Sequence, residues 1–381
     1  MKKIIVRRRM NKIKYAIIRL FKITTMIFHQ WFYRALFNQL DDSKETYVIS
    51  IIRNGRFIYP TLYSLKQYNI EVPILFVYTI PVKLILANGC GIKISFRIKN
   101  KDKKVLISDA TTQSSKWKYI KKINYNYYGI KNSEPFDVMP YYAHFDNYFK
   151  QSRFLDSDSK RDKTARFIRI AFTGNYSKNN YYDDLRLFKI TNRVKLLNHI
   201  IKVNSSNITF LESVDHFDEI QVTKKETKIL LSIDEIDNAH IVAHKLSIDK
   251  YFDLLSATDF FISAPGVVMP HCHNIIESMS RGVIPILEYN NYMYPNLVDG
   301  VNCISFNSLE ELDSKLQSVL TMNPKRIQEL RENVYKYYDE HLSTSAIKNI
   351  YTKKNNTTVY VNHEFVSLNL LTKQNQIVKG E

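Results

Sequence analysis

Apolar strand patterns alternate with helical patterns in two separate stretches of this chain, and that alternation constrains the fold more than any other feature. The first stretch has strand patterns at residues 46–52, 73–78, 93–98 and 104–109, with helical patterns at residues 57–69 and 81–91. A strand that leads into a helix and then into another strand is typical of a parallel sheet with crossover helices. We therefore predict an α/β fold.

The alternation resumes after a polar, charged segment at residues 151–163, which is the expected boundary between two domains. Strand patterns then occur at residues 166–172, 208–211, 228–232, 259–264 and 283–287, with helical patterns at residues 192–203, 247–258, 308–320 and 324–342. A length of 381 residues suits two domains. We predict a basic segment at residues 1–40, one domain with its linker at residues 41–160, a second domain at residues 161–345, and a weakly patterned tail at residues 346–381.

The formal net charge of +18 is concentrated at the amino terminus, where the first forty residues hold ten Lys or Arg and no acid. No second basic block and no zinc-finger or RNA-motif spacing is present, so we expect no nucleic-acid partner. The longest run without Lys or Arg in this segment, residues 23–33, has 11 residues, whereas a membrane span needs about 20. Two interpretations stay open: a helix on an anionic membrane surface, or an extension packed on the protein itself.

The cysteines and histidines predict neither a disulfide framework nor a metal site. Cys90, Cys272 and Cys303 are far apart and odd in number, which fits a reducing cytoplasm. His271 and His273 lie two residues apart, but no nearby side chain has a recognisable zinc spacing, and Cys272 is expected to point away from them. We expect no metal.

The stretch "APGVVMPHCHNIIESMSRGVIPI" at residues 264–286 carries the densest group of polar residues. A Pro-Gly pair at Gly266 ends a strand, a loop carries His271, and a helix is expected to begin near His273 or Asn274, because Asn is a favoured N-cap. In a parallel sheet the loops at the carboxyl ends of the strands form the ligand crevice. The helix would aim its free N–H groups at a diphosphate, with the Glu277 carboxylate one turn in, where it could accept hydrogen bonds from a ribose diol.

A more ordinary interpretation of the same stretch stays open. His273, Glu277 and Arg281 recur every four residues and share one face of the predicted helix. In that case Asn274 only caps the helix, Glu277 pairs with Arg281 in solvent, and the histidines bond local backbone. A second loop, Gly174-Asn175 after the strand at residues 166–172, offers a glycine where a backbone could approach a phosphate, or a plain turn.

Residues 259–306 resemble the donor-domain motif of GT-B glycosyltransferases, particularly the exostosin-like and bacterial surface-polysaccharide types. The resemblance covers about 50 residues clearly, with a looser match back to Arg166. It implies two Rossmann-like domains facing a central cleft and a hexosyltransferase-like enzyme with a nucleotide sugar as co-substrate and no other cofactor. It assigns donor binding to the residues singled out above: Gly174, Asn175, Gly266, His271, His273, Asn274 and Glu277.

For glycosyl transfer, Arg193 and Lys245 are the candidate phosphate clamps, and Asp109 or His144 the candidate base. Many retaining members of the family carry a second glutamate eight positions before the ribose-binding one, and here that position is Met269, which favours inversion. The resemblance also implies a glycan or lipid-linked acceptor, in lipopolysaccharide or capsule synthesis, and a cytoplasmic protein that the basic segment attaches to the inner face of the membrane. Alternatives are a nucleotide-sugar epimerase, a glycerophosphate-type transferase, or a non-enzymatic membrane or polyanion binder.

Overall fold

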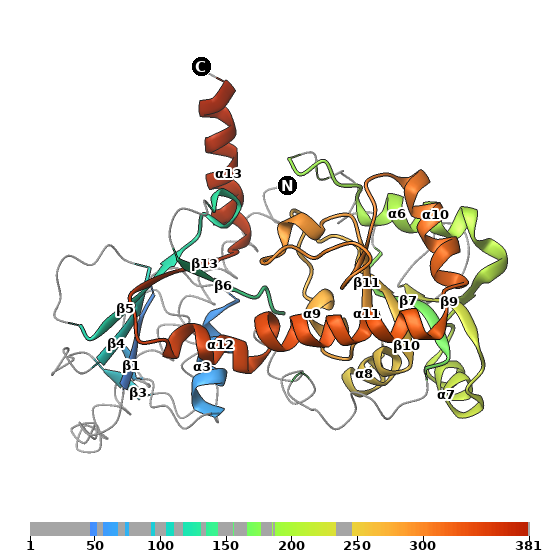
Figure 1. Cartoon of the computed structure of the whole chain (residues 1–381), viewed down its shortest axis with the longest axis horizontal. Helices are drawn as coiled ribbons and strands as arrows, with labels where there is room; N and C mark the ends of the chain where they lie inside the picture. Colours follow the sequence, from blue (N-terminus) through green and yellow to red (C-terminus); the bar gives the residue numbers. More distant parts are fainter. Residues whose placement is uncertain are drawn as a thin grey trace, which may run out of the picture. The chain divides into compact units, whose positions relative to one another are not determined.

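The computed structural model in Figure 1 describes residues 46–51, 56–67, 73–75, 93–95, 104–109, 117–130, 135–143, 155, 166–176, 185, 187–233 and 246–379. These residues divide into two compact units. The first unit contains the described residues within 1–124, 133–137 and 351–359, and the second contains those within 125–132, 138–350 and 360–381. The predicted basic segment at residues 1–40 and helix at residues 81–91 lie outside the described residues.

The first unit is built around a seven-stranded sheet with the order β3-β2-β1-β4-β5-β13-β6. Its strands are β1 (Thr46–Ser50), β2 (Pro73–Leu75), β3 (Lys93–Ser95), β4 (Lys104–Ser108), β5 (Tyr119–Asn124), β6 (Phe136–Met139) and β13 (Thr357–Val361). β1 to β5 pair in parallel, and every side chain of β4 is buried, as in a parallel strand with both faces covered. Helix α3 (Ile58–Gln67) follows β1, within the predicted helix at residues 57–69, and carries Pro60 in its first turn, where proline is tolerated.

The carboxyl-terminal tail supplies β13, a strand that the sequence pattern did not predict. It follows helix α12 (Thr344–Thr352) and lies between β5 and β6. Lys121 of β5 is fully buried, and its Nζ donates to the Lys353 carbonyl at 2.8 Å and the Asn355 carbonyl at 3.0 Å. Burial lowers the pKa of Lys121 to about 8. These bonds hold the turn before β13 against β5.

The second unit is built around a six-stranded parallel sheet with the order β12-β11-β10-β7-β9-β8. Its strands are β7 (Ile168–Gly174), β8 (Ile208–Phe210), β9 (Thr227–Ile233), β10 (Thr258–Ile262), β11 (Ile284–Leu287) and β12 (Ile304–Ser305). β7 lies in the middle, where Ile170, Ala171 and Phe172 are fully buried. This parallel sheet, together with the parallel strands β1 to β5 of the first unit and the helices between the strands, confirms the predicted α/β class.

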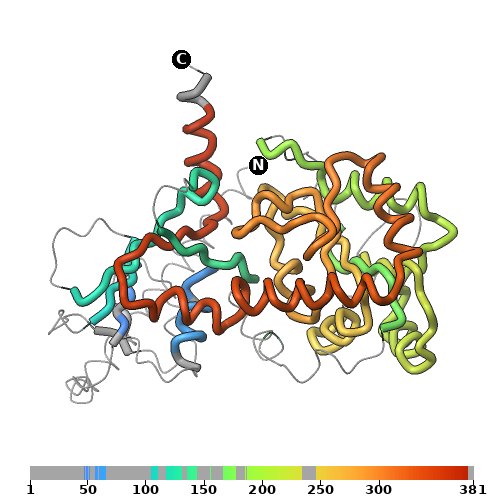
Figure 2. The backbone as a smooth tube through the Cα atoms, viewed as in Figure 1, coloured from blue at the N-terminus to red at the C-terminus, as the bar shows by residue number. Residues whose placement is uncertain are grey.

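The helices of the second unit lie mostly between its strands along the chain, and five of them are capped by their own sequences (Figures 1 and 2). They are α6 (Arg193–Val203), α7 (Val214–Thr223), α8 (Ile248–Ser256), α9 (Asn274–Met279), α10 (Leu309–Leu320), α11 (Pro324–Tyr337), the π-helical turn η6 (Tyr338–Leu342) and α13 (Glu364–Lys379). Ser or Asn side chains accept a backbone N–H at the start of α6, α7, α8, α10 and α11. α7 was not predicted. Among the described residues, no helix is both long enough and apolar enough to cross a bilayer.

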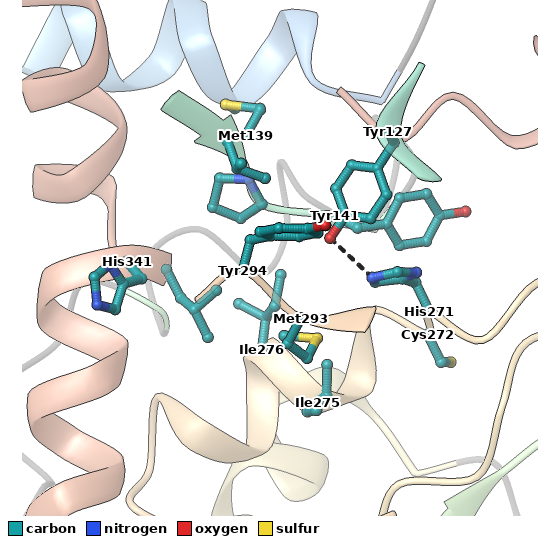
Figure 3. A pocket seen from close by; sticks show the side chains of 13 residues that line it. Tyr127, Met139, Tyr141, His271, Cys272, Ile275, Ile276, Met293, Tyr294 and His341 are labelled. Carbon is teal, nitrogen blue, oxygen red and sulfur yellow. Dashed lines mark hydrogen bonds between the residues drawn. The ribbon is translucent and has the colours of Figure 1, made fainter. Parts of the chain in front are cut away.

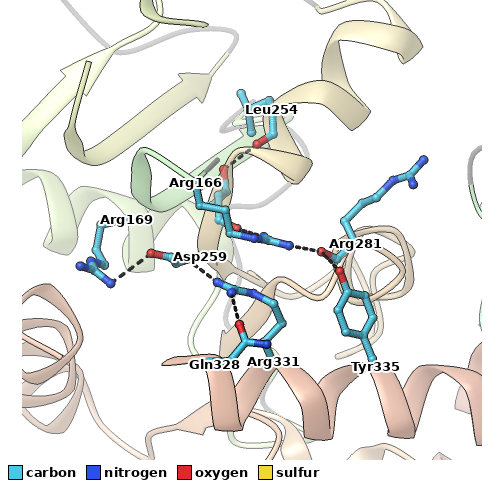
Figure 4. A network of polar contacts seen from close by, with 9 residues as sticks. Arg166, Arg169, Leu254, Asp259, Arg281, Gln328, Arg331 and Tyr335 are labelled. Atoms are coloured by element: carbon cyan, nitrogen blue, oxygen red, sulfur yellow. Dashed lines mark hydrogen bonds and ion pairs between the residues drawn. The ribbon is translucent and has the colours of Figure 1, made fainter. Parts of the chain in front are cut away.

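A network of arginines ties α11 to the amino-terminal ends of β7 and β10 (Figure 4). Asp259 accepts from Arg169 at 3.0 Å and from Arg331 of α11 at 2.5 Å. Arg166 donates to the Arg281 carbonyl at 2.5 Å and also to the Thr258 carbonyl. The network anchors the edge of the sheet opposite to the one that carries the candidate site.

Candidate functional site

The candidate site lies where β7 and β10 end. These two strands are parallel neighbours, so the loops that leave their carboxyl ends share one edge of the sheet. Gly174 is the last residue of β7, and Gly266 follows three residues after Ser263, the first residue beyond β10. Both predicted loops therefore meet at this edge, as the strand order required.

Arg193 joins the two loops. Its guanidinium donates to the Asn175 carbonyl at 3.1 Å and, through Nε, to the Pro265 carbonyl at 3.1 Å. The side chain is 3% exposed and contacts the Phe172 ring with its cationic group. Arg193 was predicted as a phosphate clamp. Its guanidinium instead donates hydrogen bonds to the carbonyls of both loops, and its positive charge lies buried between them.

Cys272 also contacts Arg193, with its Sγ 3.3 Å from Nη2. The sequence pattern did not predict this contact, which joins Cys272 to a residue 79 positions earlier. Burial by itself raises the pKa of this thiol, but the Arg193 charge, His273 and the Asn274 N–H together bring the pKa below its usual value. Groups that stabilise negative charge therefore converge on this sulfur.

The loop from Gly266 to His271 is closed on itself. The Gly266 N–H donates to the Pro270 carbonyl at 3.3 Å. A Cβ at Gly266 would lie 2.7 Å from the His271 carbonyl oxygen and 3.0 Å from that of Met269. Only glycine permits this approach of two backbone segments, so the residue is required for the shape of the loop.

Helix α9 begins where it was predicted to begin, but it differs from the prediction in its N-cap and in its exposure. It begins at Asn274, with His273 rather than Asn274 as the residue before the first turn. The Ile276 and Glu277 N–H groups bond the His273 carbonyl at 3.0 and 3.3 Å, so the expected N–H donors are already engaged. All six helical residues are buried. The expected exposed polar face is therefore absent from this helix.

Glu277 is a buried carboxylate with two side-chain partners. Tyr251 of α8 donates to Oε2 at 2.8 Å, and Nδ1 of His273 lies 2.7 Å from Oε1. The Glu277 side chain is 4% exposed, whereas that of His273 is 32% exposed. Burial and the Glu277 carboxylate both raise the pKa of Tyr251 well above its usual value, which keeps the donor protonated. The solvated pair of Glu277 with Arg281, which the more ordinary interpretation requires, does not form, because both side chains are buried and Arg281 lies over the Phe252 ring.

His271 is a buried, neutral ring whose two nitrogens both meet protein atoms (Figure 3). The Tyr292 carbonyl can only accept, so Nε2 carries the hydrogen and donates to it at 2.8 Å. Nδ1 then accepts from the Asn362 amide at 3.0 Å. The Tyr127 hydroxyl lies 3.1 Å from Nε2 and donates to the same carbonyl. Burial lowers the pKa of His271 to about 4.

Four buried polar atoms at or beside this edge have no hydrogen-bond partner among the described residues. They are Ser263 Oγ beyond β10, Tyr289 Oη beyond β11, Asn274 Oδ1 at the start of α9, and Oδ1 of Asn362, whose Nδ2 bonds His271. Tyr289 lies close enough to Cys272 and Arg193 for both to influence its pKa, which burial raises well above the usual value. Buried polar atoms in proteins are nearly always bonded, so a group of exceptions at one edge marks a place where a polar ligand can bind.

A small cavity lies beside the loop, with a volume of about 20 Å³. Its lining is largely apolar and includes Met139, Ile275, Ile276 and Met293 (Figure 3). A cavity of that size has room for about one water molecule. It does not admit a sugar or a nucleotide.

The remaining predicted residues are distributed differently. Asp109 directly follows β4 in the first unit and is partly buried. His144 and Lys245 lie outside the described residues. No group of three His, Cys, Asp or Glu side chains within the described ranges is arranged to hold a metal ion. Sequence reasoning missed Tyr251 and Asn362, since only the folded chain brings them to the loop, and it missed the contact of Cys272 with Arg193.

No protein-family model and no curated protein sequence matches the chain. Among solved structures, a glycosyltransferase from Rickettsia africae is similar with a TM-score of 0.43 and 11% identity, covering 82% of this chain and 98% of its own. HepE from Anabaena, solved with UDP, has a TM-score of 0.42 and 10% identity over 80% of this chain and 97% of its own. AviGT4, a glycosyltransferase of avilamycin A biosynthesis, has a TM-score of 0.42 and 11% identity over 82% and 96%.

Proposed function

We propose that the chain is a glycosyltransferase that takes a sugar from a nucleotide-sugar donor. One observation carries the proposal: Arg193 contacts Cys272, and the next residue, His273, contacts Glu277. These two pairs lie beyond the carboxyl ends of β7 and β10, near buried polar atoms that have no partner among the described residues. A buried cation at one end and a buried carboxylate at the other suit a ligand that carries an anionic diphosphate and a diol.

Each end of this line has a distinct role in the proposal. The Arg193 charge stabilises the diphosphate as it leaves, in a site where burial strengthens electrostatic attraction. Glu277 accepts hydrogen bonds from the ribose hydroxyls, which requires the half-exposed His273 ring to move off Oε1. His271 holds the loop rather than the ligand, because both its nitrogens bond within the protein. Asp109 and His144 stay the candidates for the base.

The acceptor in this proposal is a growing bacterial surface glycan, on a lipid carrier at the cytoplasmic face of the membrane. This part is supported by the resemblance of residues 259–306 and by the basic segment at residues 1–40. The absence of a glutamate at Met269 supports inversion at the anomeric carbon.

A thermal-shift screen with UDP-, dTDP-, GDP- and CMP-sugars tests the proposal. We expect one donor class to raise the melting temperature and to be slowly hydrolysed. Glu277→Gln keeps the shape of the side chain but removes its charge, and a hydrogen bond to a charged group contributes about 1.5–3 kcal/mol, so donor binding should weaken roughly tenfold to a hundredfold.

Tyr251→Phe is the matched control for that variant, because it removes one hydrogen bond of Glu277 and leaves the carboxylate in place. It should lower the melting temperature with a much smaller loss of donor binding. If no nucleotide sugar binds, or if the donor is epimerised and never transferred, the glycosyltransferase proposal fails.

A further inference from the structure

The tail of the chain returns to the candidate site through one buried side chain. Asn362 directly follows β13 and is 4% exposed. Its Nδ2 donates to Nδ1 of His271 at 3.0 Å and to the Tyr128 hydroxyl at 3.1 Å. All three residues belong to the second unit. A residue near the end of the chain therefore bonds the loop that carries Cys272 and His273.

The direction of this bond follows from the other side of the ring. The Tyr292 carbonyl, 2.8 Å from Nε2, has no hydrogen to give, so Nε2 must carry one. A neutral imidazole then offers only a lone pair at Nδ1. Asn362 must present its NH₂ group there, and its amide orientation and the ring tautomer fix each other.

The ring in turn fixes the loop. The His271 carbonyl lies against Gly266, and His271 directly precedes Cys272, the thiol that contacts Arg193. A change in the tautomer or tilt of the ring would displace these backbone atoms. The hydrogen bond from Gly266 to Pro270 closes the loop, so the loop backbone cannot easily rearrange to accommodate such a displacement.

We propose that Asn362 is a positioning residue for the donor site, which it shapes by holding His271 in the Nε2–H tautomer. Because it treats this site as a donor site, the proposal rests on the proposed function. It makes the carboxyl-terminal tail of the chain part of that site. Asn362 itself touches no ligand in this account.

The variant Asn362→Asp gives the proposal a pH signature. A carboxylate has the same shape as the amide but cannot donate a hydrogen bond. It therefore faces the Nδ1 lone pair of His271 with no hydrogen between them, unless the new carboxylate and His271 together bind one additional proton. The ionisable side chains whose rings contact His271 are Tyr127, Tyr128, Tyr141 and Tyr289, all neutral near pH 7. The new carboxylate favours the protonated ring and so raises the pKa of His271 in this Asn362→Asp variant. Native loop geometry is then present at low pH and is lost as the pH rises through that raised value.

The test uses the full-length chain with isotope-labelled histidine and measures the tautomer of His271 by nitrogen NMR, with His271→Gln to assign the signal. Donor affinity is measured by calorimetry in the same samples. Asn362→Leu should change the His271 signal and weaken donor binding roughly tenfold, the loss expected for one hydrogen bond to a buried group. Asn204→Leu is the matched control: Asn204 is 2% exposed, bonds the Ile200 carbonyl at the far end of α6, and should leave both readouts unchanged.

In Asn362→Asp, donor affinity should approach that of the wild type at low pH and fall as the pH rises, a profile that general destabilisation does not produce. If Asn362→Leu does not fold, the pH profile of Asn362→Asp alone tests whether Asn362 positions the donor site. The proposal is overturned if wild-type His271 is the Nδ1–H tautomer, or if both Asn362 variants bind donor as the wild type does at all pH values. If the wild type binds no donor, the proposed function fails, while the NMR still decides whether Asn362 sets the tautomer.

Discussion

At the residue scale, Cys272 and Cys303 illustrate how position decides chemistry. Both are free thiols of the second unit. Burial acts on both and raises the pKa of Cys303 to about 12. At Cys272 the Arg193 guanidinium, His273 and the Asn274 N–H outweigh burial and lower the pKa. The two sulfurs should therefore differ in reactivity, because the thiolate is the reactive form.

Iodoacetamide should label Cys272 well before Cys303 at neutral pH, and a bound nucleotide sugar should protect Cys272. The Arg193→Met variant should slow labelling at Cys272, since the largest favourable charge is removed. Peptide mass spectrometry separates the two sites from each other and from Cys90. Equal labelling of Cys272 and Cys303 in the folded protein would contradict this description.

The buried His271 ring predicts how stability changes with pH. Burial lowers its pKa to about 4, whereas the unfolded value is 6.5. Between these values the unfolded chain binds a proton that the folded chain does not, so the free energy of unfolding falls as the pH falls, by up to about 3 kcal/mol in total. Urea unfolding from pH 7 down to pH 4 measures this, and His271→Asn should flatten the curve over that range. An unchanged slope in the variant would assign the loss to other groups.

At the scale of elements, β7 to β11 of the second unit were predictable, whereas the partners of Glu277 and His271 were not. Parallel strands leave their carboxyl ends at one edge, so strand order alone brought Gly174 and Gly266 together. Periodicity cannot tell a polar residue that faces solvent from one that is buried and bonded. The partner of Glu277 is Tyr251, 26 positions earlier, and that of His271 is Asn362, 91 positions later.

The missed elements have a similar explanation. β5 and β6 lie in a stretch rich in Tyr, Asn and Lys, and β13 lies in a tail without clear alternation. Their stability depends on joining a sheet whose other strands lie far away in sequence. Lys121 is buried against the turn that precedes β13, and its ammonium finds hydrogen-bond acceptors there only when that strand has joined the sheet.

The end of α9 offers a test of how tightly this element is packed. Gly282 has a φ of +65°, and a Cβ there would lie 2.4 Å from the Tyr335 ring. Gly300 has a similar φ of +68°, but its nearest neighbour would be 3.8 Å away. Both Gly→Ala variants suffer backbone strain of about 1 kcal/mol or more, and only Gly282→Ala adds a steric clash of about 1–3 kcal/mol. Chemical denaturation measures the difference, and equal losses would rule out close packing between Gly282 and Tyr335.

At the scale of the whole molecule, the charge is concentrated in one segment. Removing residues 1–40 should release the protein from vesicles of anionic lipid, because ten cationic side chains and no acid are lost. Donor binding should persist, since the candidate site lies in the second unit. Vesicle sedimentation of the full-length and shortened chains, at low and high salt, makes this measurement. Undiminished binding of the shortened chain would place the membrane contact elsewhere.

The central claim is that the carboxyl ends of β7 and β10 bind the nucleotide sugar between Arg193 and Glu277. A crystal structure of the chain with its bound donor tests this most directly. We expect the diphosphate beside the Arg193 and Cys272 pair, the ribose hydroxyls on Glu277, and the His273 ring moved away from Oε1. A nucleotide bound at another edge of either sheet, with Glu277 still covered by His273 and Tyr251, would contradict it.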